Sequence, residues 1–381
     1  MSLSVLVASD SFKGSASSRT IAELVERGVR RVDPDARVFC LPIADGGEGT
    51  IDALLAARSG RLRHLEVRGP LGVPVDARYA LLDDGCAVLE AAEAIGIGLS
   101  DRSPASALAA SSFGLGQLLL DALDQDARRV LVGLGGSATS DGGAGFAKAL
   151  GARLLDRYGM PVEEGLAGLV RVESLDVSGL DPRLGEVDME LLLDVTNPLV
   201  GSAGAVRVFG PQKGLDPREL DRYDGWMSGW GELLHRVCGR DVAAVEGAGA
   251  AGGLGACLMA LADARPGRGI ELVLDAVGID QALAGVDLVI TGEGRMDAQS
   301  ACGKAPVGVA RRAKAQGKPV VAVVGSCSDE LEAAYAQGVD LVVPCVHEPC
   351  SLEDCMRGVE RSVPFAAESA VRAFLLGRSA V

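Results

Sequence analysis

Short apolar runs alternate with amphipathic helical patterns at both ends of the chain. Residues 3–8 form an apolar run typical of a buried strand, and the segment after it places Ile21, Leu24 and Val25 on one face of a predicted helix. Further strands, each followed by a helical pattern, are expected at residues 38–43, 286–291, 320–324 and 339–343. Because strands and helices alternate at this spacing, both ends of the chain predict a parallel sheet covered by helices.

The middle of the chain follows a different pattern. Residues 64–89 resemble successive short strands, with turn signals at Gly69-Pro70 and at Asp83-Asp84-Gly85. Helical and strand patterns then mix as far as residue 285. We therefore predict an α/β protein with a Rossmann-like parallel-sheet domain that is discontinuous in sequence, residues 1–63 and 286–381, and an inserted second mixed α/β domain, residues 64–285.

The composition narrows the class of partner. The chain of 381 residues carries a formal net charge of −15, and aromatic residues make up only 3% of it. Both features argue against a nucleic-acid partner, because phosphates would meet no basic stripe and bases no aromatic platform. The first residues lack the basic lead and long apolar stretch of a signal peptide, and no run suits a bilayer span. We predict a cytoplasmic protein with no membrane partner.

The nine cysteines are scattered, odd in number and without a CxxC pair, so a disulfide framework is not expected. Cys345, His347, Cys350 and Cys355 are potential zinc ligands that lie within eleven positions of one another. Their spacing matches none of the usual paired zinc patterns. We interpret them as incidental thiols near a strand end and a helix start, with metal binding as the alternative.

Acidic side chains recur directly after the predicted strands, usually beside glycines. They are Asp10, Asp45, Asp194, Glu293 and Asp297. In open α/β sheets ligands bind outside the carboxyl ends of the strands, where gathered carboxylates can hold Mg²⁺ or take a proton from a hydroxyl. Each acid alone could equally cap a helix or lie in a solvated turn. Their shared placement favours a site.

A glycine-rich segment, residues 133–143, lies between a predicted strand and a helix through Phe146 and Leu150. Small residues let backbone amides approach an anion, and the helix N-terminus adds favourable partial charge. A tight strand–helix turn is the alternative. Single cations in similar glycine-flanked loops suggest further anion ligands, namely Lys13, Lys213, Arg295 and Lys304.

Two familiar nucleotide-binding motifs give little support for nucleotide binding of the phosphate-loop or dinucleotide type. The chain has no GxxxxGK[ST] phosphate loop. A GxGxxG does occur at Gly247, Gly249 and Gly252, with Glu271 and Asp275 at the distance of a ribose-binding acid. Residues 240–246, however, make a poor buried strand, so dinucleotide binding stays a weak alternative. The three histidines show no nucleophile–base arrangement.

Several segments together resemble the signature segments of the bacterial type I glycerate kinases, in the same order along essentially the whole chain. They are residues 10–15 (DSFKGS), 44–50 (ADGGEGT), 135–143 (GGSATSDGG), 194–199 (DVTNPL), 210–214 (GPQKG), 247–255 (GAGAAGGLG), 291–297 (TGEGRMD) and 303–306 (GKAP). The resemblance implies transfer of the γ-phosphoryl of ATP to D-glycerate, most simply at the 2-hydroxyl to give 2-phosphoglycerate and ADP. It also implies two α/β domains, as the pattern predicts. The segment from Cys345 to Cys355 matches no part of the family pattern.

The resemblance and the residue chemistry together give a set of expected roles. We expect Asp194 to act as general base or metal ligand, with Asp297 as the second choice, and Lys213 or Lys304 to stabilise charge on the transferred phosphoryl. Substrate contacts are expected from Asp10, Lys13, Asp45, Glu48 and Arg295, with Lys13 and Arg295 on the glycerate carboxylate. Nucleotide contacts are expected from Gly135, Gly136, Ser137, Thr139, Asp141, Gly142, Gly249, Gly252 and Gly253, and Mg²⁺ contacts from Asp194 and Glu293.

Other functions remain open at this stage. They are a glycerate kinase that forms 3-phosphoglycerate, an NAD(P)-dependent hydroxy-acid dehydrogenase that uses Gly247, Gly249 and Gly252, and a two-domain protein that binds a small ligand without turning it over. The expected ligands of the favoured function are ATP, Mg²⁺ and D-glycerate. A homodimer is the oligomeric state that we consider.

Overall fold

The computed structural model describes residues 2–297, 300 and 304–378, and its chain divides into two compact units. Unit 1 comprises residues 1–45, 52–58 and 270–381, and unit 2 comprises residues 46–51 and 59–269. The predicted boundaries, 63/64 and 285/286, differ from this division for two reasons. Gly60 to Arg63 pair with Tyr79 to Leu82 in the sheet of unit 2, and helix α11 (Gly269–Ala276) packs through Ile270 close to Gly308 in unit 1.

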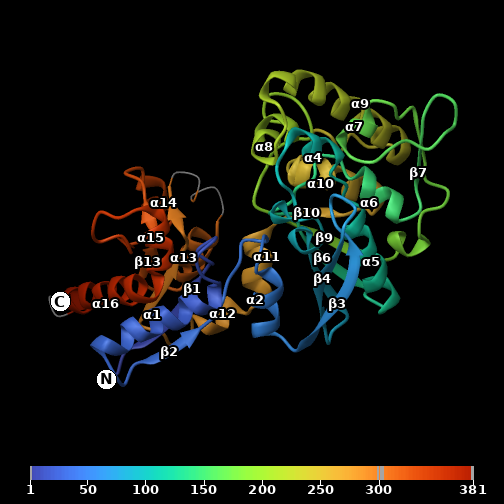
Figure 1. Ribbon diagram of the computed structural model, residues 1–381. Coiled ribbons are helices and arrows are strands. Elements are labelled where there is room, and N and C mark those ends of the chain that lie inside the picture. The colour runs from blue at the N-terminus through green and yellow to red at the C-terminus, as the bar shows by residue number, and fades with distance from the viewer. Residues whose placement is uncertain (1, 298–299, 301–303, 379–381) are drawn as a thin grey trace. The chain divides into compact units, whose positions relative to one another are not determined.

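Unit 1 is built on a five-stranded sheet in which every neighbouring pair is parallel. Figure 1 shows three of its strands, β13, β1 and β2, with helices beside them. In sheet order its strands are β15 (Leu341–Pro344), β13 (Val320–Val324), β11 (Leu288–Gly292), β1 (Ser4–Ser9) and β2 (Arg37–Cys40). The predicted Rossmann-like fold class, with a parallel-sheet domain interrupted by a second α/β unit, is confirmed. The order places β1 and β11 side by side, while the chain leaves them in opposite directions along the sheet.

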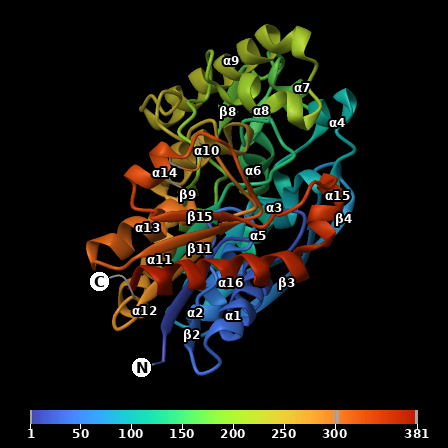
Figure 2. The same ribbon diagram turned by 90° about the vertical axis from the view of Figure 1, so that its left-hand side faces the viewer.

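The two faces of this sheet carry different helices because side chains alternate along each strand. Val5, Val7 and Ile290 pack into one core with α1 (Ser18–Val32) and the long terminal helix α16 (Val359–Arg378), which Figure 2 shows in the foreground. Helix α13 (Ala305–Ala315) contacts β1, β11 and β13. A Cβ at Gly28 would collide with the backbone of Pro364, so glycine lets α1 and α16 lie close together.

The ends of several elements follow from individual residues. Ser17 caps α1 by accepting a hydrogen bond of 3.2 Å from the backbone N of Thr20. Strand β2 is assigned only to Cys40 rather than to residue 43, although the amides of Leu41 and Ile43 still bond to β1. Pro42 between them has no donor, which an edge strand tolerates. Shorter elements of unit 1 are α12 (Ile279–Ala282), β12 (Arg295–Met296), β14 (Ser326–Cys327), α14 (Glu332–Ala336) and α15 (Leu352–Arg357).

Unit 2 contains a six-stranded mixed sheet. Its order is β10 (Arg265–Arg268), β9 (Asp188–Leu193), β6 (Arg129–Gly133), β5 (Cys86–Glu90), β4 (Pro74–Leu82) and β3 (Gly60–Arg68). Strands β3, β4 and β5 form an antiparallel meander where the sequence predicts successive short strands, and β5, β6, β9 and β10 run parallel. The carboxyl ends of β5, β6 and β9 therefore meet at one edge, because Glu90 pairs with Gly133 and Gly133 with Leu192.

Helices surround this second sheet and bury its largest side chains. Trp230, Tyr79 and Phe146 are almost fully buried. The helices are α3 (Ala91–Ile95), α4 (Pro104–Ala109), α5 (Phe113–Asp124), α6 (Ala144–Ala149), α7 (Leu166–Leu169), α8 (Ala205–Lys213), α9 (Leu220–Cys238) and α10 (Ala250–Leu261), with a small antiparallel ribbon of β7 (Arg153–Leu155) and β8 (Ser174–Asp176). Helix α2 (Thr50–Ala57) begins in unit 2 and continues in unit 1.

Candidate functional site

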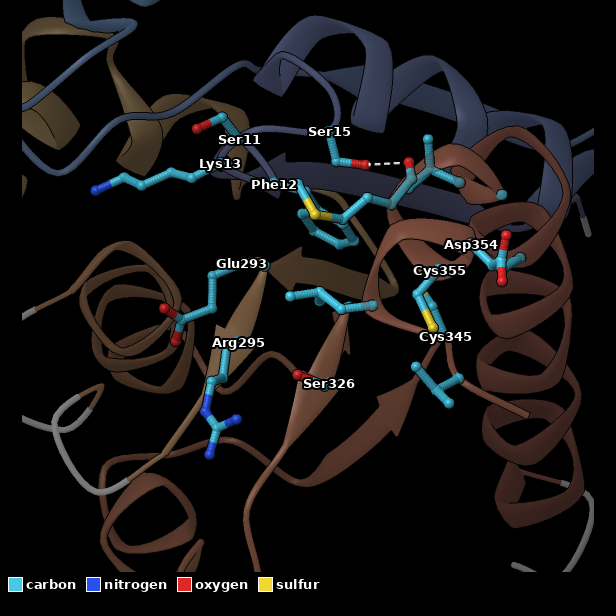
Figure 3. Close-up of a pocket in the computed structure, with 18 of the residues that line it drawn as sticks. Ser11, Phe12, Lys13, Ser15, Glu293, Arg295, Ser326, Cys345, Asp354 and Cys355 are labelled. Carbon is cyan, nitrogen blue, oxygen red and sulfur yellow. Dashed lines mark hydrogen bonds between the residues drawn. The ribbon is translucent and has the colours of Figure 1, made fainter. Parts of the chain in front are cut away.

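A cavity of about 860 Å³ lies in unit 1 where β1 and β11 end (Figure 3). Asp10 directly follows β1 and Glu293 directly follows β11, and both line the cavity. This is the point at which the strand order of the sheet reverses, where ligands bind in open α/β folds. Its charged lining includes six residues that the sequence predicts for the site: Asp10, Lys13, Asp45, Glu293, Arg295 and Lys304.

Buried carboxyl groups dominate one part of this cavity. Asp10 is 6% exposed, and its Oδ1 accepts a hydrogen bond of 2.6 Å from the backbone N of Ser11. Burial and the neighbouring charge of Asp45 raise the pKa of Asp10 to about 8. Burial also raises the pKa of Glu293, which Lys304 opposes with its Nζ 3.3 Å from Oε2. The site is therefore rich in negative charge that a bound cation or a proton would stabilise.

Substituting Asp10 by asparagine should stabilise the protein at neutral pH. Because the folded pKa of Asp10 lies above the ordinary value of 3.8, the folded state keeps a proton that the unfolded chain releases, and stability is lost as pH rises from about 4 to 8. Asparagine removes that loss. We expect a melting temperature at pH 7.5 higher by about 2–4 °C, the shift that about 1 kcal/mol gives a domain of this size. Thermal unfolding followed by circular dichroism at pH 4.5 and 7.5 measures it, and a difference that does not shrink at the lower pH would contradict the argument.

Lys13 and Arg295 are more accessible than the buried acids of the cavity. Lys13 is exposed, and the Arg295 side chain is 67% exposed with its Nε 3.5 Å from Oδ2 of Asp297. Figure 3 shows the side chains of Lys13 and Glu293 directed to the same side of the site. Asp297 is partly buried, and its backbone N donates to Ser300 Oγ at 3.1 Å. Gly303, which belongs to the predicted GKAP segment, lies outside the described residues.

Unit 2 gathers the other predicted residues at the carboxyl edge of its parallel strands. The glycine-rich loop follows β6, Asp194 follows β9 and is exposed, and the segment from Gly46 to Ile51 packs between them, since a Cβ at Gly46 would lie 2.7 Å from the Leu192 side chain. Glu48, in that segment, is exposed. The structure therefore brings Glu48, Asp194 and the glycine loop to one edge of unit 2, whereas Glu48 was expected in the domain of residues 1–63 and 286–381.

The two glycine-rich segments of unit 2 pack against each other. The backbone N of Gly142 donates to the carbonyl of Gly252 at 3.0 Å, and a Cβ at Gly252 would collide with the carbonyl of Thr139. Ala251, Gly252 and Gly253 have consecutive φ values of 50°, 68° and 93°, which bend the chain sharply before the regular part of α10. Left-handed backbone is strained at an alanine, and such strain concentrates at functional sites.

Lys213 is buried beneath this pair of segments, at the end of α8. Its side chain is directed inward, where Nζ donates to the carbonyl of Thr139 at 2.7 Å and to Ser137 Oγ at 3.1 Å. Burial lowers the pKa of Lys213 to about 8, and the charge of Asp141 opposes the shift. A positive charge that fixes the backbone of a glycine-rich loop supports the binding of an anion there.

Asp141 has a structural place within the same loop. It is fully buried, and its Oδ2 accepts hydrogen bonds from the backbone N of Ser112 at 2.8 Å, from Ser112 Oγ at 2.9 Å and from the backbone N of Gly145 at 3.0 Å. Its Oδ1 accepts one from the backbone N of Gly143 at 3.2 Å. Burial raises its pKa. The carboxylate thus holds the loop and the start of α6 in place, whereas the sequence predicts a nucleotide contact.

Two residues that sequence reasoning did not select help to shape this edge. Glu90 ends β5, is 2% exposed, and accepts hydrogen bonds from the backbone N of Ile51 at 2.7 Å and of Gly49 at 3.2 Å. Burial raises the pKa of Glu90 to about 7. Trp230 Nε1 donates to the carbonyl of Gly142 at 2.7 Å. Glu90 is an acid at the end of an apolar strand, as the predicted site acids are, and this pattern could have identified it from the sequence.

The structure does not support the alternative dinucleotide site or the alternative metal site. No strand precedes Gly247, and the predicted ribose acids Glu271 and Asp275 form ion pairs with Arg311 and Arg312 instead. In the part of the chain that the structure describes, no three His, Cys, Asp or Glu side chains stand close enough together to hold a metal ion, the cluster from Cys345 to Cys355 included. Within the same residues, no helix is both long and apolar enough to cross a membrane.

Glycine-rich loops in one unit and a charged cavity at the strand ends of the other are features typical of an α/β phosphotransferase. The model of the glycerate kinase family matches residues 5–375. Glycerate 2-kinase of Escherichia coli K12 is 41% identical over 98% of this chain and 99% of its own, and glycerate kinase of Bacillus subtilis 168 is 44% identical over 92% of both. A crystal structure of a candidate glycerate kinase 2 from Salmonella typhimurium LT2 superposes with a TM-score of 0.84 at 42% identity, covering all of both chains. The protein belongs to the glycerate kinase family.

Proposed function

We propose that this protein transfers the γ-phosphoryl of ATP to the 2-hydroxyl of D-glycerate, giving 2-phosphoglycerate and ADP. The observation that carries the proposal is the cavity at the ends of β1 and β11, where Lys13 and Arg295 stand among buried carboxyl groups. A three-carbon acid needs this combination, cations for its carboxylate and acceptors for its hydroxyls. The 2-hydroxyl is favoured because the Escherichia coli relative is named a glycerate 2-kinase, and the 3-hydroxyl is the alternative.

The proposal assigns a binding or catalytic role to residues of each unit. In unit 1, Lys13 and Arg295 bind the glycerate carboxylate, and Asp10 and Asp45 accept hydrogen bonds from its hydroxyls. In unit 2, backbone amides of the glycine-rich segments bind the nucleotide phosphates above Lys213. Asp194 takes the proton of the attacking hydroxyl, with Asp297 as the second candidate, and Lys304 stabilises charge on the transferred group. Phosphoryl transfer needs such positioning and charge neutralisation more than covalent catalysis.

Magnesium is part of the proposal, and the donor chemistry fits it. Oε1 of Glu293 is buried without a hydrogen-bond partner among the described residues, and it is a hard oxygen ligand of the kind that Mg²⁺ takes. Proteins usually hold Mg²⁺ through one or two carboxylates and the substrate phosphates, so a preassembled set of three ligands is not required. Glu293 in unit 1 and Asp194 in unit 2 are each a candidate residue that would hold it. The ion would neutralise charge on the phosphates.

Phosphorus NMR tests the reaction and its position together. ATP, MgCl₂ and D-glycerate are incubated with the full chain, and the phosphate ester is compared with authentic 2- and 3-phosphoglycerate. We expect the 2-phosphate ester, with formation of ADP. The 3-phosphate ester would move the assignment to the alternative kinase. Binding of glycerate without any turnover of ATP would point to a binding protein. Nicotinamide reduction with a hydroxy acid would indicate the dehydrogenase.

Replacing Lys13 by methionine should raise the KM for glycerate by about tenfold or more, the loss of one charge-assisted contact of about 1.4 kcal/mol or more. The KM for ATP should change little, because Lys13 lines the cavity of unit 1 and not the glycine-rich segments of unit 2. Steady-state kinetics with each substrate varied in turn measures both constants. Arg19→Met removes an exposed cation of α1 outside the cavity and serves as the matched control. Equal effects of the two substitutions would refute the assignment of Lys13.

Localisation and assembly complete the proposal. We infer a cytoplasmic enzyme, in line with its scattered and odd-numbered cysteines, which do not suit a disulfide framework. We further propose a homodimer, which light scattering coupled to size-exclusion chromatography tests directly, since one chain has a mass of 39.0 kDa.

A further inference from the structure

Two thiols at the ends of one short helix lie against each other in unit 1. Cys350 precedes α15 and Cys355 lies near its end, and their Sγ atoms are 2.6 Å apart. A disulfide bond brings two sulfurs to about 2.05 Å, so little movement separates this pair from a bond. Cys350 is exposed and Cys355 is partly exposed, which leaves the pair open to small reagents.

The pair belongs to the wall of the cavity described above. Both cysteines line it, together with Cys345, Asp354 and Met356. Figure 3 shows Cys345, Cys355 and Asp354 on the opposite side of the site from Lys13 and Glu293. The pair is therefore close enough to affect the shape of the cavity without touching its charged end.

A direct contact connects this wall to the loop that carries Lys13. Ser15 Oγ donates a hydrogen bond of 2.6 Å to the carbonyl of Met356, the residue directly after Cys355, and Figure 3 shows this bond dashed. Gly14, with φ of 76°, packs on the same residue, since a Cβ there would lie 2.8 Å from Met356 Cε. Any change at Cys355 is thus passed to the segment from Asp10 to Ser15 through one hydrogen bond and one packing contact.

We propose that Cys350 and Cys355 form a reversible intramolecular disulfide that weakens glycerate binding. The oxidant is a low-molecular-weight disulfide such as oxidised glutathione. The Cys350 sulfur attacks it, forming a mixed disulfide and releasing one small thiol. The Cys355 sulfur then attacks Cys350, closing the protein disulfide and releasing the second small thiol. The two thiol protons end on the two released thiols, so two cysteines are oxidised and one small disulfide is reduced.

The expected direction follows from the mechanical link. A closed disulfide fixes Cys355, and with it the carbonyl of Met356 that holds Ser15. The segment from Asp10 to Ser15 then loses freedom to adjust around the glycerate carboxylate, and this step rests on the proposed function. The hydrogen bond between the two thiols raises the pKa of Cys350 to about 11, so the attacking Cys350 thiol is mostly protonated at neutral pH. Oxidation should therefore be slow without excess oxidant.

The experiment uses the full chain in glutathione buffers of increasing oxidised-to-reduced ratio. Alkylation and peptide mass spectrometry identify the oxidised pair, and kinetics on the same samples gives the KM for glycerate, each preparation compared with its own reduced form. We expect an intramolecular Cys350–Cys355 disulfide and a KM raised by about fivefold or more, a coupling of about 1 kcal/mol. Reduction with dithiothreitol should restore the original value. Cys350→Ser and Cys355→Ser should each abolish the change, whereas Cys40→Ser, at another exposed cysteine, should not.

The outcomes separate this proposal from the proposed function. Glutathione adducts without the internal disulfide, or the disulfide with an unchanged KM, would overturn the redox proposal. Stoichiometric zinc bound by the reduced pair would also overturn it in favour of a metal site. Failure of the fully reduced enzyme to phosphorylate glycerate would instead overturn the proposed function, while disulfide formation would still be scored by mass.

Discussion

Lys213→Met is expected to lower kcat/KM for ATP by about 10–10²-fold, because the loop that is proposed to bind the nucleotide loses hydrogen bonds from a charged group, which are typically worth about 1.5–3 kcal/mol each. The lysine is buried, and its Nζ holds the carbonyl of Thr139 and the hydroxyl of Ser137. Methionine fills a similar volume but donates no hydrogen bond, so the glycine-rich loop loses both its positive charge and its fixed backbone. Steady-state kinetics with ATP varied measures the loss.

The pH dependence gives a second readout for the same residue. Because the pKa of Lys213 is about 8, the wild-type enzyme should lose activity as the lysine is neutralised above that pH. The variant should lack this alkaline limb. Lys148→Met is the matched control, since Lys148 is a partly buried lysine of unit 2 that likewise donates to a backbone carbonyl, that of Val162. A control as impaired as Lys213→Met would show that the loss reflects folding rather than the loop.

The parts of the fold that depend on local pattern were predictable. Apolar runs gave β1, β11 and β13 almost to the residue, because parallel strands buried on both faces need uninterrupted Val, Ile and Leu. The rule that acids after such strands gather at one edge correctly brought Asp10 and Glu293 into one cavity. The glycine-rich segments were recognisable for a similar reason, since the chain can turn and approach itself there only without side chains.

What the sequence could not predict is the direction of individual side chains. The sequence predicts that Asp141 and Lys213 act on the ligand. In the structure both side chains are directed into the protein, toward Ser112 and Thr139 respectively. Their partners lie 29 and 74 positions away, so no local periodicity reports them. The division near residue 59 depends on such a contact, because Gly60 pairs with Leu82 in the sheet of unit 2. Long-range contacts decide these features.

Asp194→Asn is expected to lower kcat by about 10²–10⁴-fold, the range for loss of a general base, with a smaller change in the KM for glycerate. Asp194 directly follows β9 and is exposed at the edge where the glycine-rich loop leaves β6, since Gly133 and Leu192 pair in the sheet. Asparagine keeps the size and polarity of the side chain but cannot accept the proton. Rapid-quench measurement of the first turnover separates the chemical step from product release.

The matched control for this prediction lies at the other end of the same strand. Asp188 is the first residue of β9, and its Oδ1 lies 2.6 Å from Arg265 on the surface, so Asp188→Asn should leave kcat within about twofold, as a surface ion pair contributes little. If Asp194→Asn changes kcat as little as the control does, Asp194 is not the base. Asp297→Asn then becomes the decisive variant. A large loss there, beside Arg295, would move proton transfer to the cavity of unit 1.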